Sequence, residues 1–241
     1  MDRTIILHYH LFKNAGTSLD AILKQNFGDK WATREFPSAG GNNTSLVEDW
    51  IRETPEAIAY SSHSMMGPIP QVEGVKVISI MLLRDPIERI KSAYRFERKQ
   101  AAETFGAVLA RHTDMEGYMK VRLSLPHDRQ CRNFQTQRLA TLVPGPEPEL
   151  ARAVSALGRL SVVGLVSDFS GTLKRLATAI TNPFPDFSWK EVHSNRSRKE
   201  DVDVPDALEA LLAEPNADDL ALLAALETHL AKMASKCSDE P

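Results

Sequence analysis

The sequence predicts an α/β fold, in which a mainly parallel sheet is flanked by helices and is followed by a helical C-terminal extension. Three observations lead to this prediction. Residues 4–9 and 75–83 are apolar, β-branched runs with the composition of buried strands. Strand patterns alternate with helical patterns along the chain, which is typical of a parallel sheet covered by helices. The last segment, 219–236, carries an apolar stripe at helical spacing, and core packing explains that stripe best.

The elements follow one another in a regular order. The strand at residues 4–9 leads through a turn of small residues into a helix ending near Phe27. Ser45 and Glu48 have the spacing of a capping box, which predicts a helix from about residue 46 to 53. The further elements expected are a strand at 57–62, a strand at 75–83, a helix from Pro86 to about 100, helices within 104–142, a linker at 143–148, a helix at 149–157, a strand at 161–166, a helix at 169–180 and a loop at 181–198.

Composition limits the classes of function. The 241 residues suit one α/β domain, which we assign to residues 1–200, with residues 201–241 as a helical extension packed on it. The formal net charge of −3 gives no general electrostatic case for binding nucleic acid, so any anion site must rest on local positive charge.

The two cysteines, Cys131 and Cys237, lie in no metal-binding or CxxC pattern, and we interpret both as free thiols. No window approaches the roughly 18 apolar residues of a membrane span, and residues 4–9 are too short for a signal-peptide core. A cytoplasmic protein without a membrane segment is therefore the expectation.

The turn after the first strand has the features of a phosphate-binding loop. Residues 13–18 read Lys-Asn-Ala-Gly-Thr-Ser and stand just before a helix, whose first N–H groups favour an anion. The order differs from the GxxxxGK[ST] of nucleotide triphosphatases, because here the lysine comes first. A simple helix cap after a strand is the alternative interpretation.

A second motif begins where the predicted strand at residues 75–83, the most apolar one, ends. Residues 84–94 read Arg-Asp-Pro-Ile-Glu-Arg-Ile-Lys-Ser-Ala-Tyr, at the carboxyl end of the strand, where open α/β sheets bind ligands. Arg84 and Ser92 could share one anion if the intervening turn folds back. Arg89 and Lys91 are either anion ligands or solvated charges, and Asp85 could instead hold Mg²⁺ as in nucleotidases.

Together these motifs resemble those of sulfotransferases that use 3′-phosphoadenosine-5′-phosphosulfate (PAPS), in particular the carbohydrate branch that contains heparan sulfate 2-O-sulfotransferase and its bacterial relatives. That family's first signature is commonly His-Ile-Pro-Lys-Thr-Gly-Gly-Thr-Ser, and residues 10–18 read His-Leu-Phe-Lys-Asn-Ala-Gly-Thr-Ser. The family's Arg-Asp-Pro-x-x-Arg-x-x-Ser-x-Tyr is matched at every fixed position from Arg84 to Tyr94. Residues 133–139 echo a third stretch, Asn-x-Gln-Thr-Arg. The resemblance covers about residues 4–200; Phe12, Asn14 and Ala15 depart from the pattern.

The resemblance implies a sulfotransferase-type, P-loop-like fold and transfer of a sulfuryl group from PAPS to an acceptor hydroxyl, in particular one on a saccharide. Because the leaving phosphate departs readily, we expect no requirement for a metal ion. The loop would bind the 5′-phosphosulfate, with Lys13 stabilising the leaving phosphate, while Arg84 and Ser92 would bind the 3′-phosphate. The donor-binding residues expected are Lys13, Asn14, Ala15, Gly16, Thr17, Ser18, Arg84, Ser92 and Arg196, the last from a basic loop that relatives close over the donor or that is simply solvated.

His63 is the candidate general base. It follows the strand at 57–62, and an imidazole titrates near neutrality, which suits proton abstraction from a hydroxyl. A similar segment of the 2-O-sulfotransferase branch carries that branch's catalytic histidine. The alternative is a histidine that is merely hydrogen-bonded at a strand end. His127 and Glu35 are reserve candidates, and His10 is expected to brace the loop.

Two other functions are alternatives for this sequence. A P-loop-like kinase of small molecules would need ATP, Mg²⁺ and a Walker lysine, and we find no lysine at the Walker position in this sequence. A catalytically inactive module of the same fold would bind the product nucleotide, 3′-phosphoadenosine-5′-phosphate (PAP), without turnover.

Overall fold

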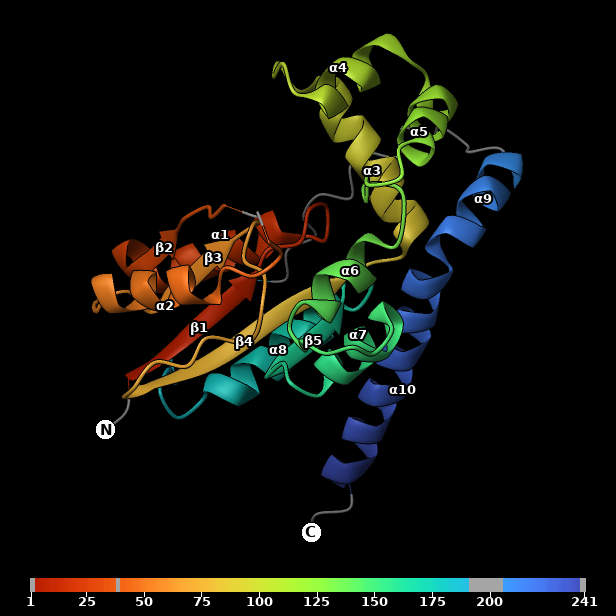
Figure 1. The fold of residues 1–241 in the computed structure, drawn as a ribbon. Coiled ribbons are helices and arrows are strands. Elements are labelled where there is room, and N and C mark those ends of the chain that lie inside the picture. Colours follow the sequence, from red (N-terminus) through yellow and green to blue (C-terminus); the bar gives the residue numbers. More distant parts are fainter. Residues whose placement is uncertain (1–2, 38–39, 191–205, 239–241) are drawn as a thin grey trace.

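A computed structural model describes residues 3–37, 40–190 and 206–238 and contains one five-stranded sheet, in which every pairing is parallel (Figure 1). The strand order is β2-β3-β1-β4-β5. The strands are β1 (Arg3–Tyr9), β2 (Trp31–Thr33), β3 (Ala59–Ser62), β4 (Val75–Leu83) and β5 (Val162–Leu165). The predicted α/β fold with a mainly parallel sheet is therefore confirmed.

Alternate residues of β1 divide the core into two layers. Ile5 and Leu7 face a cluster built with α2 (Thr44–Glu53), α6 (Phe134–Ala140), α7 (Glu149–Leu157) and α10 (Ala217–Ser238). Ile6 faces the opposite cluster, with α1 (Gly16–Phe27) and α8 (Phe169–Ile180). A strand whose successive side chains are all buried lies in the middle of a sheet covered on both faces, as its apolar run predicts.

A separate helical group stands beyond the carboxyl ends of the strands (Figure 1). Its members are α3 (Pro86–Lys99), α4 (Phe105–His112), α5 (Met115–Ser124) and α9 (Asp206–Ala213), which share a small core of their own. Pro86 occupies the first turn of α3, and the Asp85 side chain caps that helix by accepting from Glu88 N–H (2.9 Å).

The C-terminal helix α10 runs beside α6 and α7 (Figure 1). Leu222 and Leu226 are fully buried in the main core, so this part of the predicted apolar stripe packs on the α/β domain, whereas Met233 near the end of the stripe is exposed. No helix in the described ranges combines the length and the apolar character needed to cross a bilayer.

Sequence patterns placed some boundaries wrongly. The predicted capping box is wrong, because α2 begins one residue earlier than Ser45 and Asn43 stands at its N-cap position without a side-chain cap. The three-residue strand β2 and the short helix η1 (Gly28–Lys30) were not predicted, since three residues are too few for a recognisable period. Helix α9 falls within the predicted helical extension, 201–241, but before the segment 219–236 for which an individual helix was predicted.

Candidate functional site

Three neighbouring strands end at the same edge of the sheet, and each is followed by a residue of the candidate site. Tyr9, the last residue of β1, is paired with Ser62 of β3 on one side and with Met81 of β4 on the other. His10 follows β1 directly, and His63 follows β3 directly. Strand β4 continues two residues past Met81 to Leu83, and Arg84 follows it. Carboxyl ends of parallel strands are where open α/β sheets bind ligands.

The loop between β1 and α1 has a constrained backbone. Lys13 (φ 65°) and Ala15 (φ 58°) both adopt left-handed conformations, which are costly for residues with a Cβ. Gly16 opens α1 directly against His10, and a Cβ at this glycine would lie 2.1 Å from the His10 ring. The N-cap residue Ala15 makes no side-chain cap. Ser18 N–H donates to the Ala15 carbonyl (3.0 Å), so the N–H groups that an anion could meet at this end of α1 are those of Gly16 and Thr17.

Positive charge gathers beside this loop. Arg84 Nη1 donates to the carbonyl oxygen of Lys13 (3.2 Å), so the two cationic residues are neighbours. Burial lowers the pKa of Lys13, and the charge of Arg84 lowers it further. Arg95 adds to the same positive field. Burial lowers the pKa of Arg84, and the like charge of Arg95 also acts to lower it. The buried Nε of Arg95 has no hydrogen-bond partner within the described ranges.

Little negative charge balances this group. Glu88 Oε2 is 3.7 Å from Arg84 Nη2, and the Lys13 ammonium has no carboxylate within 4 Å in the part of the chain that the structure describes. Instead the ammonium lies 4.5 Å from the centre of the Phe96 ring. Partly desolvated cations that lack close counter-charges are suited to binding an anionic ligand.

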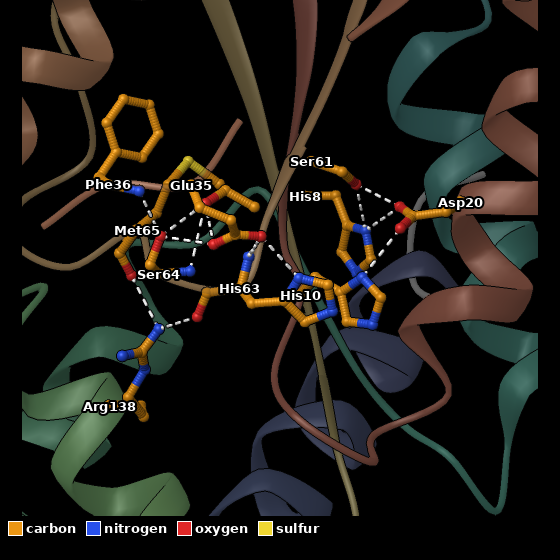
Figure 2. Close-up of polar contacts among 11 residues, drawn as sticks. His8, His10, Asp20, Glu35, Phe36, Ser61, His63, Ser64, Met65 and Arg138 are labelled. Carbon is orange, nitrogen blue, oxygen red and sulfur yellow. Dashed lines mark hydrogen bonds and ion pairs between the residues drawn. The ribbon is translucent and has the colours of Figure 1, made fainter. Parts of the chain in front are cut away.

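The candidate base is held by a carboxylate. His63 Nδ1 lies 2.7 Å from Glu35 Oε1, which also accepts from the His63 backbone N–H (3.2 Å) (Figure 2). Ser64 Oγ donates to the other oxygen, Oε2, at 2.5 Å. Arg138 of α6 donates to the His63 carbonyl at 2.5 Å and so also holds the backbone at His63. With Nδ1 committed to Glu35, the half-exposed ring is left with Nε2 as its free proton acceptor.

A second carboxylate–histidine pair lies against the first. The His10 ring centre is 3.9 Å from that of His63, and His10 Nδ1 is 2.8 Å from Asp20 Oδ2 (Figure 2). The other oxygen of Asp20 contacts His8 Nδ1 at 2.8 Å and accepts from Ser61 Oγ. His10 thus touches Gly16 of the loop on one side and His63 on the other, and it brings the candidate base next to the candidate phosphate loop.

The two carboxylates are held in their ionised forms. Burial alone would raise the pKa of Asp20, but hydrogen bonds from His10 and His8 outweigh it and hold this pKa far below its usual range. Burial likewise raises the pKa of Glu35, and hydrogen bonds from Ser64 and His63 more than reverse that effect. Burial lowers the pKa of His8, so this inner histidine is kept neutral.

Replacing Asp20 by asparagine should make stability depend less on pH. A carboxyl whose folded pKa is depressed stabilises the protein above its unfolded pKa of about 4, and this contribution is lost as the pH falls below that value. At pH 7 we expect Asp20→Asn to cost about 1–3 kcal/mol, the cost of unsatisfied buried partners. Denaturant unfolding of both proteins from pH 7 to pH 3 should show the difference shrinking, whereas exposed Asp29→Asn should change little throughout. A difference of equal size at every pH would contradict this account of Asp20.

The other predicted residues fall in different places. Ser92 is half-buried on α3, two turns after Arg84. The Asn14 side chain turns inward and donates to the Leu82 carbonyl (2.8 Å), while Thr17 is exposed at the start of α1. Arg196 lies outside the described residues. His127 is exposed in the turn after α5.

Three other residues of the 84–94 motif make contacts that define their roles. Arg89 is fully buried, with its guanidinium 4.5 Å from the Phe134 ring centre, so it is not a solvated charge. Lys91 is paired with Glu88 (3.2 Å) and Glu209 (2.8 Å). The capping role of Asp85 leaves one of its oxygens committed to the helix, which weakens its candidacy as a metal ligand.

Sequence reasoning missed Asp20 and His8 and gave Glu35 only a reserve role. One signal was present, since His8 and His10 are two residues apart and so project from the same face of the strand. Asp20 stands one helical turn after Gly16, on the helix that returns across these strands. Nothing local in the sequence linked Glu35 to His63, because the contact joins residues 28 apart.

Comparison with known proteins places the chain in a family. A protein of Archaeoglobus fulgidus, described as an uncharacterized protein, is 36% identical to it over 227 residues, which cover 90% of this chain and 89% of the relative. The chain belongs to the same family as this archaeal protein. No family model matches the chain. The match covers most of both proteins, so the two are of comparable length.

Proposed function

We propose that this protein is a PAPS-dependent sulfotransferase that transfers a sulfuryl group to the hydroxyl of an acceptor, in particular a saccharide. The observation that carries the proposal is the contact between two groups. A histidine–carboxylate pair, His63 with Glu35, lies against His10, and His10 in turn lies against Gly16 of the strained loop that precedes α1. A candidate base and a candidate phosphate site therefore adjoin at one edge of the sheet.

The local charge supports an anionic donor. Lys13, Arg84 and Arg95 form a positive group in a chain whose formal net charge is −3. The exposed Phe96 ring and the neighbouring Phe12, whose ring centres are 5.6 Å apart, offer apolar surface next to these cations. Cations beside aromatic rings suit a ligand that carries both phosphate groups and a heterocycle.

The residues present would carry out the transfer in one displacement. His63 Nε2 takes the proton of the acceptor hydroxyl while the hydroxyl oxygen forms a bond to sulfur. The bond between sulfur and the bridging phosphate oxygen breaks, and PAP leaves with its new negative charge next to Lys13. Glu35 holds the histidine ring and favours the cation that forms on it, as a carboxylate does for the histidine of a hydrolase triad.

A thermal-shift screen with PAP, ADP, ATP and NAD tests the donor class. A ligand that binds the folded state raises its apparent stability by mass action, by about 2.7 kcal/mol at a hundred times its Kd. We expect PAP to produce the largest shift. A larger response to ATP, seen only with Mg²⁺, would favour the kinase, and a response to PAP without turnover on any acceptor would favour the inactive module.

Chelators should leave sulfuryl transfer intact. The leaving group departs readily, and the cations needed to stabilise it are supplied by side chains. His8, His10 and Asp20 bring their polar atoms within 4.8 Å of one another, yet both carboxylate oxygens are paired with histidine nitrogens at 2.8 Å, a hydrogen-bond length. Turnover should therefore be equal with and without EDTA. Activity that is lost in EDTA and restored by Mg²⁺ would contradict the proposal.

A further inference from the structure

A buried glutamine joins the two anion-binding motifs. Gln135, in the first turn of α6, is fully buried. Its Oε1 accepts from the Asn14 side chain (2.7 Å) and from the Arg84 backbone N–H (2.8 Å), while its Nε2 donates to the Arg84 carbonyl (2.7 Å). One side chain therefore fixes the backbone of Arg84 at two points and also holds the middle of the 13–18 loop.

Asn14 continues this connection into the sheet. The same Nδ2 that reaches Gln135 also donates to the carbonyl of Leu82 (2.8 Å), the residue before the end of β4. The loop after β1 and the turn after β4 are therefore positioned against each other through one amide pair. Small displacements of that pair would move Lys13 relative to Arg84, and such displacements are costly in a ligand site that depends on geometry.

The C-terminal helix holds Gln135 in place. Asp219 of α10 is fully buried and accepts from the backbone N–H groups of Gln135 (3.2 Å) and Thr136 (2.7 Å) and from Thr136 Oγ1 (2.8 Å). It thereby caps α6, whose own N-cap residue, Asn133, makes no side-chain cap. Asn133 Oδ1 in turn accepts from Asp219 N–H (3.2 Å), so the two helix starts cap each other.

We infer that Gln135 and Asp219 are positioning residues, through which the C-terminal helix sets the geometry of the anion site. They do not touch a ligand; they act through Asn14 and Arg84. Gln135 lies in a stretch, 133–139, to which the proposed chemistry assigns no catalytic or donor-binding residue, and Asp219 lies in a helix far from the site along the chain. The inference rests on the proposed function only for the choice of PAP as the ligand that reports on the site.

Matched variants separate positioning from simple stabilisation. Gln135→Leu removes the amide at nearly constant volume, and Asp219→Asn is a milder change that keeps one acceptor for Thr136. Leu226→Ala is the control, because Leu226 is fully buried on the same helix and belongs to the core rather than to the polar junction. It should lower stability at least as much, since buried Leu→Ala changes cost about 2–5 kcal/mol.

We expect Gln135→Leu to weaken PAP about tenfold, measured by titration calorimetry at a temperature at which every variant is folded, and Asp219→Asn to weaken it less. Leu226→Ala should leave the affinity within about twofold of the parent. Unchanged affinity in Gln135→Leu, or an equal loss in Leu226→Ala, would overturn the inference.

Hydrogen exchange keeps the inference testable if the parent protein does not bind PAP, an outcome that would reject the proposed function instead. Amides of residues 13–18 should exchange faster in Gln135→Leu and Asp219→Asn than in Leu226→Ala at matched global stability. If exchange in the loop follows global stability alone in all three variants, Gln135 and Asp219 do not position the loop.

Discussion

Replacing His63 by alanine should lower turnover by about 10²–10⁴-fold, the usual contribution of a general base, and should leave PAP affinity nearly unchanged. The physical reason lies in how the ring is held. Glu35 occupies Nδ1 at 2.7 Å, and Nε2 remains for the acceptor proton. The ring stacks on His10, and His10 in turn lies against Gly16, so removal of the His63 ring should leave Lys13 and the first turn of α1 in place. Steady-state kinetics with a saccharide acceptor, together with PAP titration, measure both quantities.

Three further variants make this test decisive. Glu35→Gln keeps the size of the side chain and one acceptor but removes its charge, so it should reduce turnover less than His63→Ala does. His127→Ala is the matched control, since His127 is exposed in the turn after α5. If His63→Ala remained active while Glu35→Ala or His127→Ala abolished turnover, we would have assigned the wrong base.

The parts of the fold that the sequence predicted are those encoded by local patterns. The apolar runs of β1 and β4 and the proline in the first turn of α3 each specify their element within a few residues. These elements were predicted close to their observed bounds. The turn after β1 was also recognisable from its lysine, glycine and two hydroxyls, but its predicted extent, 13–18, is too long, because α1 begins at Gly16 and residues 16–18 form its first turn.

The parts that the sequence did not predict depend on contacts between distant residues. Gln135 meets Asn14 across 121 positions and Asp219 across 84, and no periodicity reports such a pairing. Asp20 has the same character, since its role appears only when α1 folds back over the strand that carries His8 and His10. Buried polar networks of this kind are specified by tertiary packing, so their members look like ordinary surface residues in the sequence.

Arg84→Ala should weaken PAP by about 10- to 150-fold and should leave AMP nearly unaffected. PAP differs from AMP only in the 3′-phosphate, which we assign to Arg84 and Ser92. A guanidinium–phosphate contact is charge-assisted and worth about 1.5–3 kcal/mol, and each 1.4 kcal/mol is about tenfold in affinity. Arg84 is suited to this contact because its cation is half-buried, and the nearest carboxylate paired with it in the described ranges, that of Glu88, is 3.7 Å away.

The structure also provides the competing explanation, since Arg84 Nη1 donates to the Lys13 carbonyl at 3.2 Å and could serve only to brace the loop. A bracing role predicts that both ligands weaken together, because the loop would bind the 5′-phosphate that PAP and AMP share. Lys13→Ala provides the reference for that outcome and should weaken both ligands. Calorimetric titration of PAP and AMP into each folded variant gives the affinity ratio. A ratio in Arg84→Ala equal to that of the parent protein would remove the 3′-phosphate assignment, and with it the strongest support for PAPS as the donor.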